Sequence, residues 1–212
     1  MELVEESMLK ALGFACLVLL IGVLVGMQAD DARTSFIEDQ IEESNIKAQT
    51  FIVTENYLSE SSQNYCRVVS GQIPEIAEGN AQIGRDLQSM SGKSITRTND
   101  YDQLKRKYYV NQLRLYNMLE GYRDRCDADT TSVFYFFDSS IDSQRQGAVL
   151  TEYRNQVDNE TYVFSFNLET DDSAVLDILR EDYNVTDAPT LVVNGNQTYR
   201  GYTPLEEMRD IL

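Results

Sequence analysis

Apolar residues recur at steps of three and four over much of the first 126 residues, the spacing of one face of an α-helix. A first helix is expected from about residue 31 to residue 62, with charged residues between its apolar positions. These apolar positions are Ile37, Ile41, Ala48, Phe51, Ile52 and Leu58. No proline interrupts this stretch, so the pattern predicts one continuous helix.

Two further helices are expected before residue 127. Glycines break the pattern after residue 63, and Pro74 suits the first turn of a short helix that ends near Met90. Thr98, Asn99 and Asp100 offer N-cap side chains for a stronger helix that ends near Arg125. Its apolar stripe consists of Leu104, Tyr108, Leu115, Met118, Leu119 and Tyr122. The region 28–126 is therefore predicted to be helical.

The pattern changes after a polar junction at 127–131. Short runs rich in aromatic and β-branched residues now alternate with stretches of helical spacing. The predicted strands are 133–137, 162–168, 190–193 and 197–200, and the predicted helices cover 141–157, the stretch after 171–173, and 203–212. The order is β-α-β-α-β-β-α, which makes the whole chain α+β with a separate α/β domain at 127–212.

The turn chemistry around Pro189 is the most specific local signal in this domain. Pro189 must be the first residue of its strand, because proline cannot donate to a ladder of hydrogen bonds. Asn194 and Gly195 form the residue pair most favoured in two-residue hairpin turns. The tight entry into the strand makes the Ala188–Pro189 bond the best candidate for a cis peptide.

Residues 132–212 resemble the thioredoxin fold, on the order of the elements together with Ala188-Pro189-Thr190 and the Asn-Gly turn. The resemblance implies that Pro189 is cis and that Ala188, Pro189 and Thr190 contribute to a surface that binds extended peptide. It also places the family's redox Cys-x-x-Cys motif at Ser140-Ile141-Asp142-Ser143, or one residue to either side.

Serines at 140 and 143 remove the redox chemistry of that motif. A serine hydroxyl forms no disulfide and needs a nearby base to act as a nucleophile. Ser139 or Ser140 is better interpreted as a helix cap, and Asp142 as a charge favourable at the helix N-terminus. We therefore expect no catalytic residue, no metal site and no cofactor, and an enzyme is not the favoured interpretation.

An uncharged apolar run occupies residues 11–27. Its seventeen residues span roughly 25 Å as a helix, enough for a thin bilayer core. The run predicts a transmembrane helix, with a cleaved signal peptide as the alternative. Lys10 precedes the run, so the positive-inside rule places residues 1–10 in the cytoplasm and the rest of the chain outside.

Cysteines and glycosylation patterns agree with that location. Cys66 and Cys126 are the only cysteines beyond the apolar run, and an oxidising compartment favours a structural disulfide between them. The alternative is a reactive dithiol. Three Asn-x-Thr acceptor patterns for glycosylation begin at Asn159, Asn184 and Asn196.

The charge of the chain limits its partners. The formal net charge is −17, and the sequence contains no histidine, the usual general base and commonest metal ligand. Nucleic acids are not expected as partners, because they require a basic surface.

These observations favour a membrane-anchored, extracytoplasmic protein, similar to archaeal membrane-bound thioredoxin-like proteins, that binds, chaperones or scaffolds other exported proteins. The first alternative is a thiol-disulfide oxidoreductase that uses Cys66 and Cys126. The second is a purely structural subunit of a membrane complex.

Overall fold

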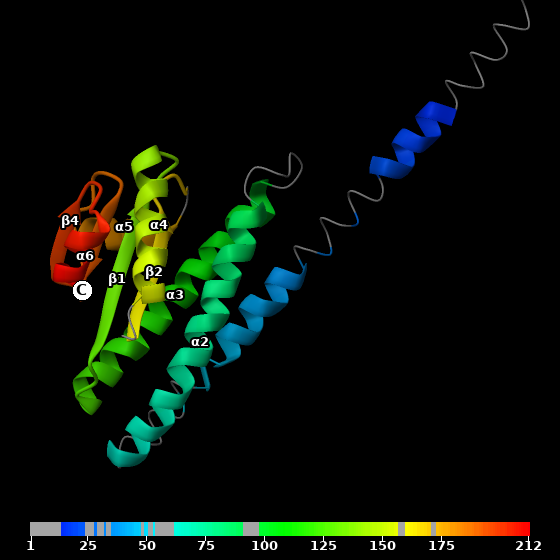
Figure 1. Ribbon diagram of the computed structural model, residues 1–212. Coiled ribbons are helices and arrows are strands. Elements are labelled where there is room, and N and C mark those ends of the chain that lie inside the picture. The colour runs from blue at the N-terminus through cyan, green and yellow to red at the C-terminus, as the bar shows by residue number, and fades with distance from the viewer. Residues whose placement is uncertain are drawn as a thin grey trace, which may run out of the picture.

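The computed structural model describes residues 14–23, 28, 32, 35–47, 49–50, 53, 62–90, 98–156, 160–170 and 173–212. Helical segments at 14–23 and 35–47 precede the labelled elements of Figure 1. These are α2 (Ser62–Met90), α3 (Thr98–Cys126), β1 (Thr130–Phe137), α4 (Ile141–Gln156), β2 (Glu160–Asn167), α5 (Ala174–Asp182), β3 (Thr190–Val193), β4 (Gln197–Arg200) and α6 (Leu205–Ile211).

The strands form a mixed four-stranded sheet in the order β2-β1-β3-β4. β1 pairs parallel with β2, with Thr130 opposite Glu160, and antiparallel with β3, with Phe136 opposite Thr190. β3 and β4 form the hairpin expected from the Asn-Gly turn, and both turn residues have positive φ. From β1 to α6, the elements follow the β-α-β-α-β-β-α order predicted from the sequence.

Alternation along the strands gives the sheet two apolar faces. The α3 face carries Phe134, Phe136, Phe164, Phe166 and Val192, which pack with residues of α2, α3 and α5. The opposite α4 face carries Val133, Tyr135, Leu191 and Val193, which pack with α4 and with Met208 of α6. α3 lies along the sheet in Figure 1, so the helical region and the sheet share one core.

The helices of the N-terminal half pack as an antiparallel pair, α2 and α3, with segment 35–47 beside them (Figure 1). A buried polar network connects all three. Ser44 donates to Asn80 Oδ1 over 3.0 Å, and Asn111 Nδ2 donates to the carbonyl of Ile41 over 3.3 Å. Each bond requires one alignment of the helices along their axes, so the network fixes their register.

The expected break in the helical pattern around residues 71–79 is absent. α2 begins at Ser62 and continues through Gly71, Pro74 and Gly79. The buried side chains follow one stripe through these positions: Tyr65, Val69, Ile73, Ile76, Ile83 and Leu87. Burial of this stripe against α3 outweighs the unfavourable helix propensities of glycine and proline. The predicted short helix starting at Pro74 was therefore wrong in its N-terminal boundary.

The predicted Cys66–Cys126 disulfide is confirmed, with Cα atoms 5.6 Å apart. Cys66 lies in the second turn of α2, and Cys126 is the last residue of α3. Because α2 and α3 run antiparallel, a simple helical hairpin places both cysteines at one end, the lower end in Figure 1.

The predicted transmembrane helix at 11–27 is wrong. Among the residues that the structure describes, no helix is both long enough and apolar enough to cross a membrane. Membrane attachment and a single-pass extracytoplasmic location, which depended on that helix, are corrected with it. Residues 1–13 and 24–27 lie outside the described residues.

Candidate functional site

The loop between β1 and α4 contains both serines of the predicted redox position. Asp138 accepts hydrogen bonds at Oδ1 from the backbone N–H of Ser140 over 3.0 Å and from Ser143 Oγ over 2.7 Å. Ser143 Oγ in turn accepts from the backbone N–H of Asp138 over 3.2 Å. The carboxylate of Asp138 therefore holds the start of α4 against the end of β1.

Both serine hydroxyls are used for structure. Ser140 caps α4, because its Oγ accepts from the backbone N–H of Ser143 over 3.2 Å. Ser143 itself is only 1% exposed. Tyr135 of the α4 face donates its hydroxyl to the Ser143 carbonyl. These contacts fix the conformation of the loop and bury the Ser143 side chain.

The pKa of Asp138 lies below its ordinary value of 3.8, because hydrogen bonds from Ser140 and then from Ser143 favour the ionised carboxylate. The carboxylate is consequently ionised at neutral pH. It acts as an acceptor that fixes the loop and does not carry a transferable proton.

Pro189 lies beside this loop, and the Ala188–Pro189 bond is cis. Because Phe136 is opposite Thr190 in the antiparallel pair, the next position places Pro189 alongside Phe137, the last residue of β1. The carbonyl of Pro189 accepts from the backbone N–H of Gly201 over 2.8 Å. The structure thus brings the Ser140 loop and Pro189 to the same end of the sheet.

The three residues predicted to contact a peptide differ in exposure. Pro189 and Thr190 are buried, and Thr190 Oγ1 donates to the carbonyl of Asp187 over 2.7 Å. Ala188 is half-buried. Only Ala188 presents an accessible side chain, so Pro189 and Thr190 contribute by shaping the backbone.

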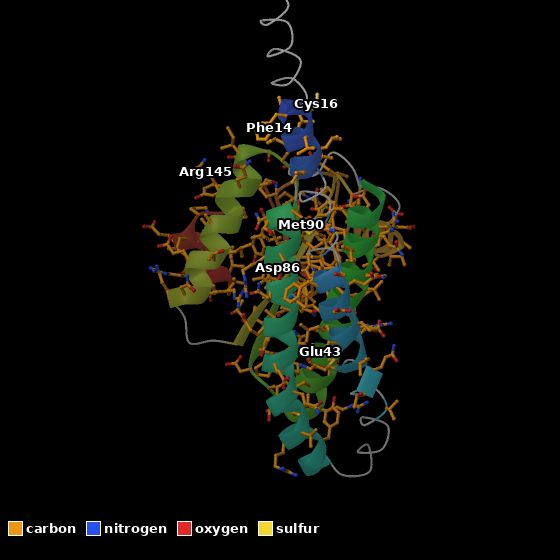
Figure 2. All side chains as sticks on the ribbon, turned by 90° about the vertical axis from the view of Figure 1, so that its right-hand side faces the viewer. Phe14, Cys16, Glu43, Asp86, Met90 and Arg145 are labelled. Carbon is orange, nitrogen blue, oxygen red and sulfur yellow. A yellow bond between two sulfur atoms is a disulfide. The ribbon has the colours of Figure 1, made fainter. Side chains whose placement is uncertain are left out.

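Three residues that surround this end were not singled out as binding residues from the sequence. Ile141 opens α4 and is 74% exposed. The guanidinium of Arg145 stacks on the ring of Tyr202, 4.3 Å from its centroid, and Tyr202 follows directly after Gly201. Figure 2 shows Arg145 on the side of α4 away from α2. The sequence did contain a signal for two of these residues: Ile141 and Arg145 lie four positions apart, on the same face of a helix whose surface is otherwise polar.

The other predicted residues lie elsewhere. Cys66 and Cys126 are at the opposite end, where β1 begins, and the eight residues of β1 separate the two ends by roughly 26 Å. Asn184 and Asn196 are exposed, as glycosylation acceptors must be, whereas Asn159 lies outside the described residues. Within the described ranges, no three histidine, cysteine or acidic side chains are grouped as a metal site.

Comparison with known proteins identifies no family for this chain. No protein family matched in a scan of family descriptions, and no curated protein matched its sequence. A solved structure described as "Structure of a malarial protein" matches at 15% identity with a TM-score of 0.33, covering 39% of this chain and 92% of its own. A similarity of this extent carries no argument about fold or function.

Proposed function

We propose that the chain is a thioredoxin-like protein without redox cysteines that binds extended segments of other proteins at the Pro189 end of its sheet. The observation that carries this proposal is the position of Pro189 at the end of the sheet, beside a loop in which Ser140 caps α4 and Ser143 bonds to Asp138. The β2-β1-β3-β4 strand order, with α4 and α5 following β1 and β2, also supports it.

The surface around Pro189 suits a peptide more than a small molecule. The exposed side chain of Ile141 and the stacked Arg145–Tyr202 pair offer apolar and aromatic contact area. The half-buried Ala188 leaves room for a backbone to approach, because its side chain is a single methyl group. An extended segment that passes Ala188 would contact these side chains without needing a deep pocket.

A permanently unfolded protein is the appropriate probe. We expect reduced, carboxymethylated α-lactalbumin to bind the full chain, and Ile141→Asp to weaken this binding about tenfold or more because the substitution removes an apolar contact and adds a charge. Binding is measured by fluorescence anisotropy of the labelled probe.

Ile178→Asp is the matched control. Ile178 is 61% exposed on α5, a helix that packs on the α3 face rather than on the α4 face. Equal binding by wild type, Ile141→Asp and an Ala188→Arg variant would contradict the proposal.

A structural subunit of a protein complex is the second candidate. The segment 14–23 favours it, because its large apolar side chains are exposed by 51–71% along the whole segment. Such a surface is typical of a contact with another protein chain. Cross-linking through Cys16, which is exposed in this segment, tests the idea: a single cross-linked partner in constant ratio supports it, and cross-links to no specific protein contradict it.

A further inference from the structure

β2 is an outer strand of the sheet, so alternate residues along it direct their backbone N–H and C=O groups away from β1. Ser165 is one of these outward residues, because its backbone N–H and C=O both bond to a side chain outside the sheet. With a period of two, Thr161, Val163 and Asn167 direct their backbone groups the same way.

Side chains of α3 satisfy only half of this edge. The buried amide of Gln112 donates to the carbonyl of Ser165 over 2.8 Å and accepts from its N–H over 2.9 Å, as a neighbouring strand would. The hydroxyl of Tyr109 accepts from the N–H of Asn167 over 2.8 Å. Within the described part of the chain, no side chain bonds to the outward backbone groups of Thr161 or Val163. The edge is therefore closed at one half and open at the other.

A cavity of about 260 Å³ lies against the open half. Residues of α2, including Ala77 and Ala81, and Leu115 of α3 line it opposite Thr161–Phe164. The outward backbone groups of Thr161 and Val163 lie beside this cavity. Unpaired backbone donors and acceptors spaced two residues apart indicate an occupant with the hydrogen-bonding repeat of a strand.

The charges at the rim indicate the chemistry of that occupant. Glu78 lines the cavity and is already paired with Arg85 at 2.8 Å. Arg154 of α4 also lines it, and no carboxylate among the described residues pairs with Arg154. At physiological salt, charges beyond about 8 Å are screened, so Arg154 rather than the net charge of the chain decides which side chain fits. The local charge favours an acidic one.

We propose that the open half of the β2 edge, Thr161 to Val163, binds a short extended peptide segment of another protein, with small apolar residues facing Ala77 and Leu115 and acidic residues facing Arg154. The segment continues the sheet beyond the half that Gln112 closes. Residues of α2 also line the cavity, which disfavours the sheet of a second copy as the occupant. This site is independent of Pro189, which lies at the other end of β1.

The probe is a capped pentapeptide in which valine and aspartate alternate, titrated into the full chain by calorimetry at physiological salt. Val163→Pro is the decisive variant. The N–H of Val163 points away from β1, so proline removes the donor for the peptide without removing a bond of the sheet. We expect binding to weaken about tenfold, and Val163→Ala, which keeps the N–H, to bind within about threefold of wild type.

Charge reversal tests the acidic partner. We expect Arg154→Glu to bind the aspartate peptide about tenfold more weakly and to prefer a matched peptide in which valine and lysine alternate. Arg145→Glu and Ile141→Asp, at the Pro189 end, leave this binding unchanged and so distinguish the two sites. The proposal is overturned if wild type binds neither peptide at millimolar concentration, or if Val163→Pro and Val163→Ala bind equally well.

Discussion

Both faces of the sheet bury apolar side chains, but the residues that cover them come from different parts of the chain. The α4 face is covered by α4 and α6, which lie within about 80 residues of β1 along the sequence. The α3 face is covered mainly by helices that precede the sheet, including Tyr109, Leu115 and Leu119 of α3. One face is thus completed locally, and the other requires the N-terminal half of the molecule.

This difference shows that a change in sequence pattern does not always separate two independently stable domains. The pattern changes from helical to β at 127–131, yet the cluster that contains Phe134 and Phe166 continues through α3 and α2 to Ile37. Burial of one phenylalanine contributes about 2 to 3 kcal/mol, comparable with a large part of the net stability of a small domain. Without α3, four phenylalanines of the sheet lose their cover.

The largest expected effect follows from cutting at that boundary. A chain that begins at Asp127 should fail to fold cooperatively, because Phe134, Phe136, Phe164 and Phe166 would face water. Circular dichroism and thermal unfolding measure this, with the full chain as control. A fragment that unfolds cooperatively at the temperature of the full chain would contradict the distinction between the faces.

Phe166→Ala and Met208→Ala compare the two faces directly, since both side chains are 0% exposed. Phe166 contacts the rings of Tyr109, Phe134 and Phe136 at 5.1 to 5.7 Å, so its removal should cost about 4 to 5 kcal/mol. Met208→Ala should cost about 2 to 3 kcal/mol. Urea unfolding gives both values, and equal losses would remove the proposed difference.

Removal of the disulfide tests how firmly the helices that cover the α3 face are held. The bridge closes a loop with a sequence separation of 60, so the double variant Cys66→Ser/Cys126→Ser should lose about 4 kcal/mol. The wild-type chain under reducing conditions is the control, because it lacks the bridge and keeps both cysteine side chains. A double variant as stable as wild type would show that helix packing alone holds the hairpin.

Gln112→Met separates packing from hydrogen bonding at the β2 edge. Methionine fills a similar volume but leaves the N–H and C=O of Ser165 without partners, at a cost of about 2 kcal/mol. Hydrogen exchange should accelerate at the Ser165 amide and stay slow at Phe166, whose N–H points to β1. Slow exchange at both amides would mean that another group replaces Gln112.

Asp138 gives the smallest effect and the clearest dependence on pH. Its pKa is lower in the folded chain than the ordinary value of 3.8, so its stabilising contribution is complete above that pH and is lost as the pH falls below it. Asp138→Ala should cost about 1 kcal/mol at pH 7 and progressively less as the pH falls below 3.8. Denaturation at several pH values measures this, and Asp138→Asn, which keeps an acceptor oxygen, serves as the control. A cost independent of pH would contradict the assigned role.

Local signals in the sequence predicted the elements after residue 130, the Asn194–Gly195 turn and the cis bond before Pro189. Each of these depends on the backbone preferences of one or two residues. The pairing of Cys66 with Cys126 was also correct, because only two cysteines remained beyond the apolar run.

Long-range packing accounts for what the sequence did not predict. Gly71 and Pro74 indicated a break, but burial of the stripe around them keeps α2 continuous. No local pattern marks Gln112 as the partner of a strand 53 residues later. The apolar run at 11–27 predicted a span that no described helix provides. At the candidate site, Ser140 was correctly interpreted as a helix cap. The exposure of Ile141 could not be predicted, because it depends on how α4 packs against the sheet.

The position of the disulfide also determines how the molecule responds to mechanical tension. Cys126 lies only four positions before Thr130, the first residue of β1. A pulling force that enters from the N-terminal side at Cys66 crosses the sulfur bridge and passes almost directly into the central strand, bypassing most of α2 and all but the end of α3. The residues between Cys66 and Cys126, roughly 200 Å long when fully extended, carry no tension until the bridge is reduced.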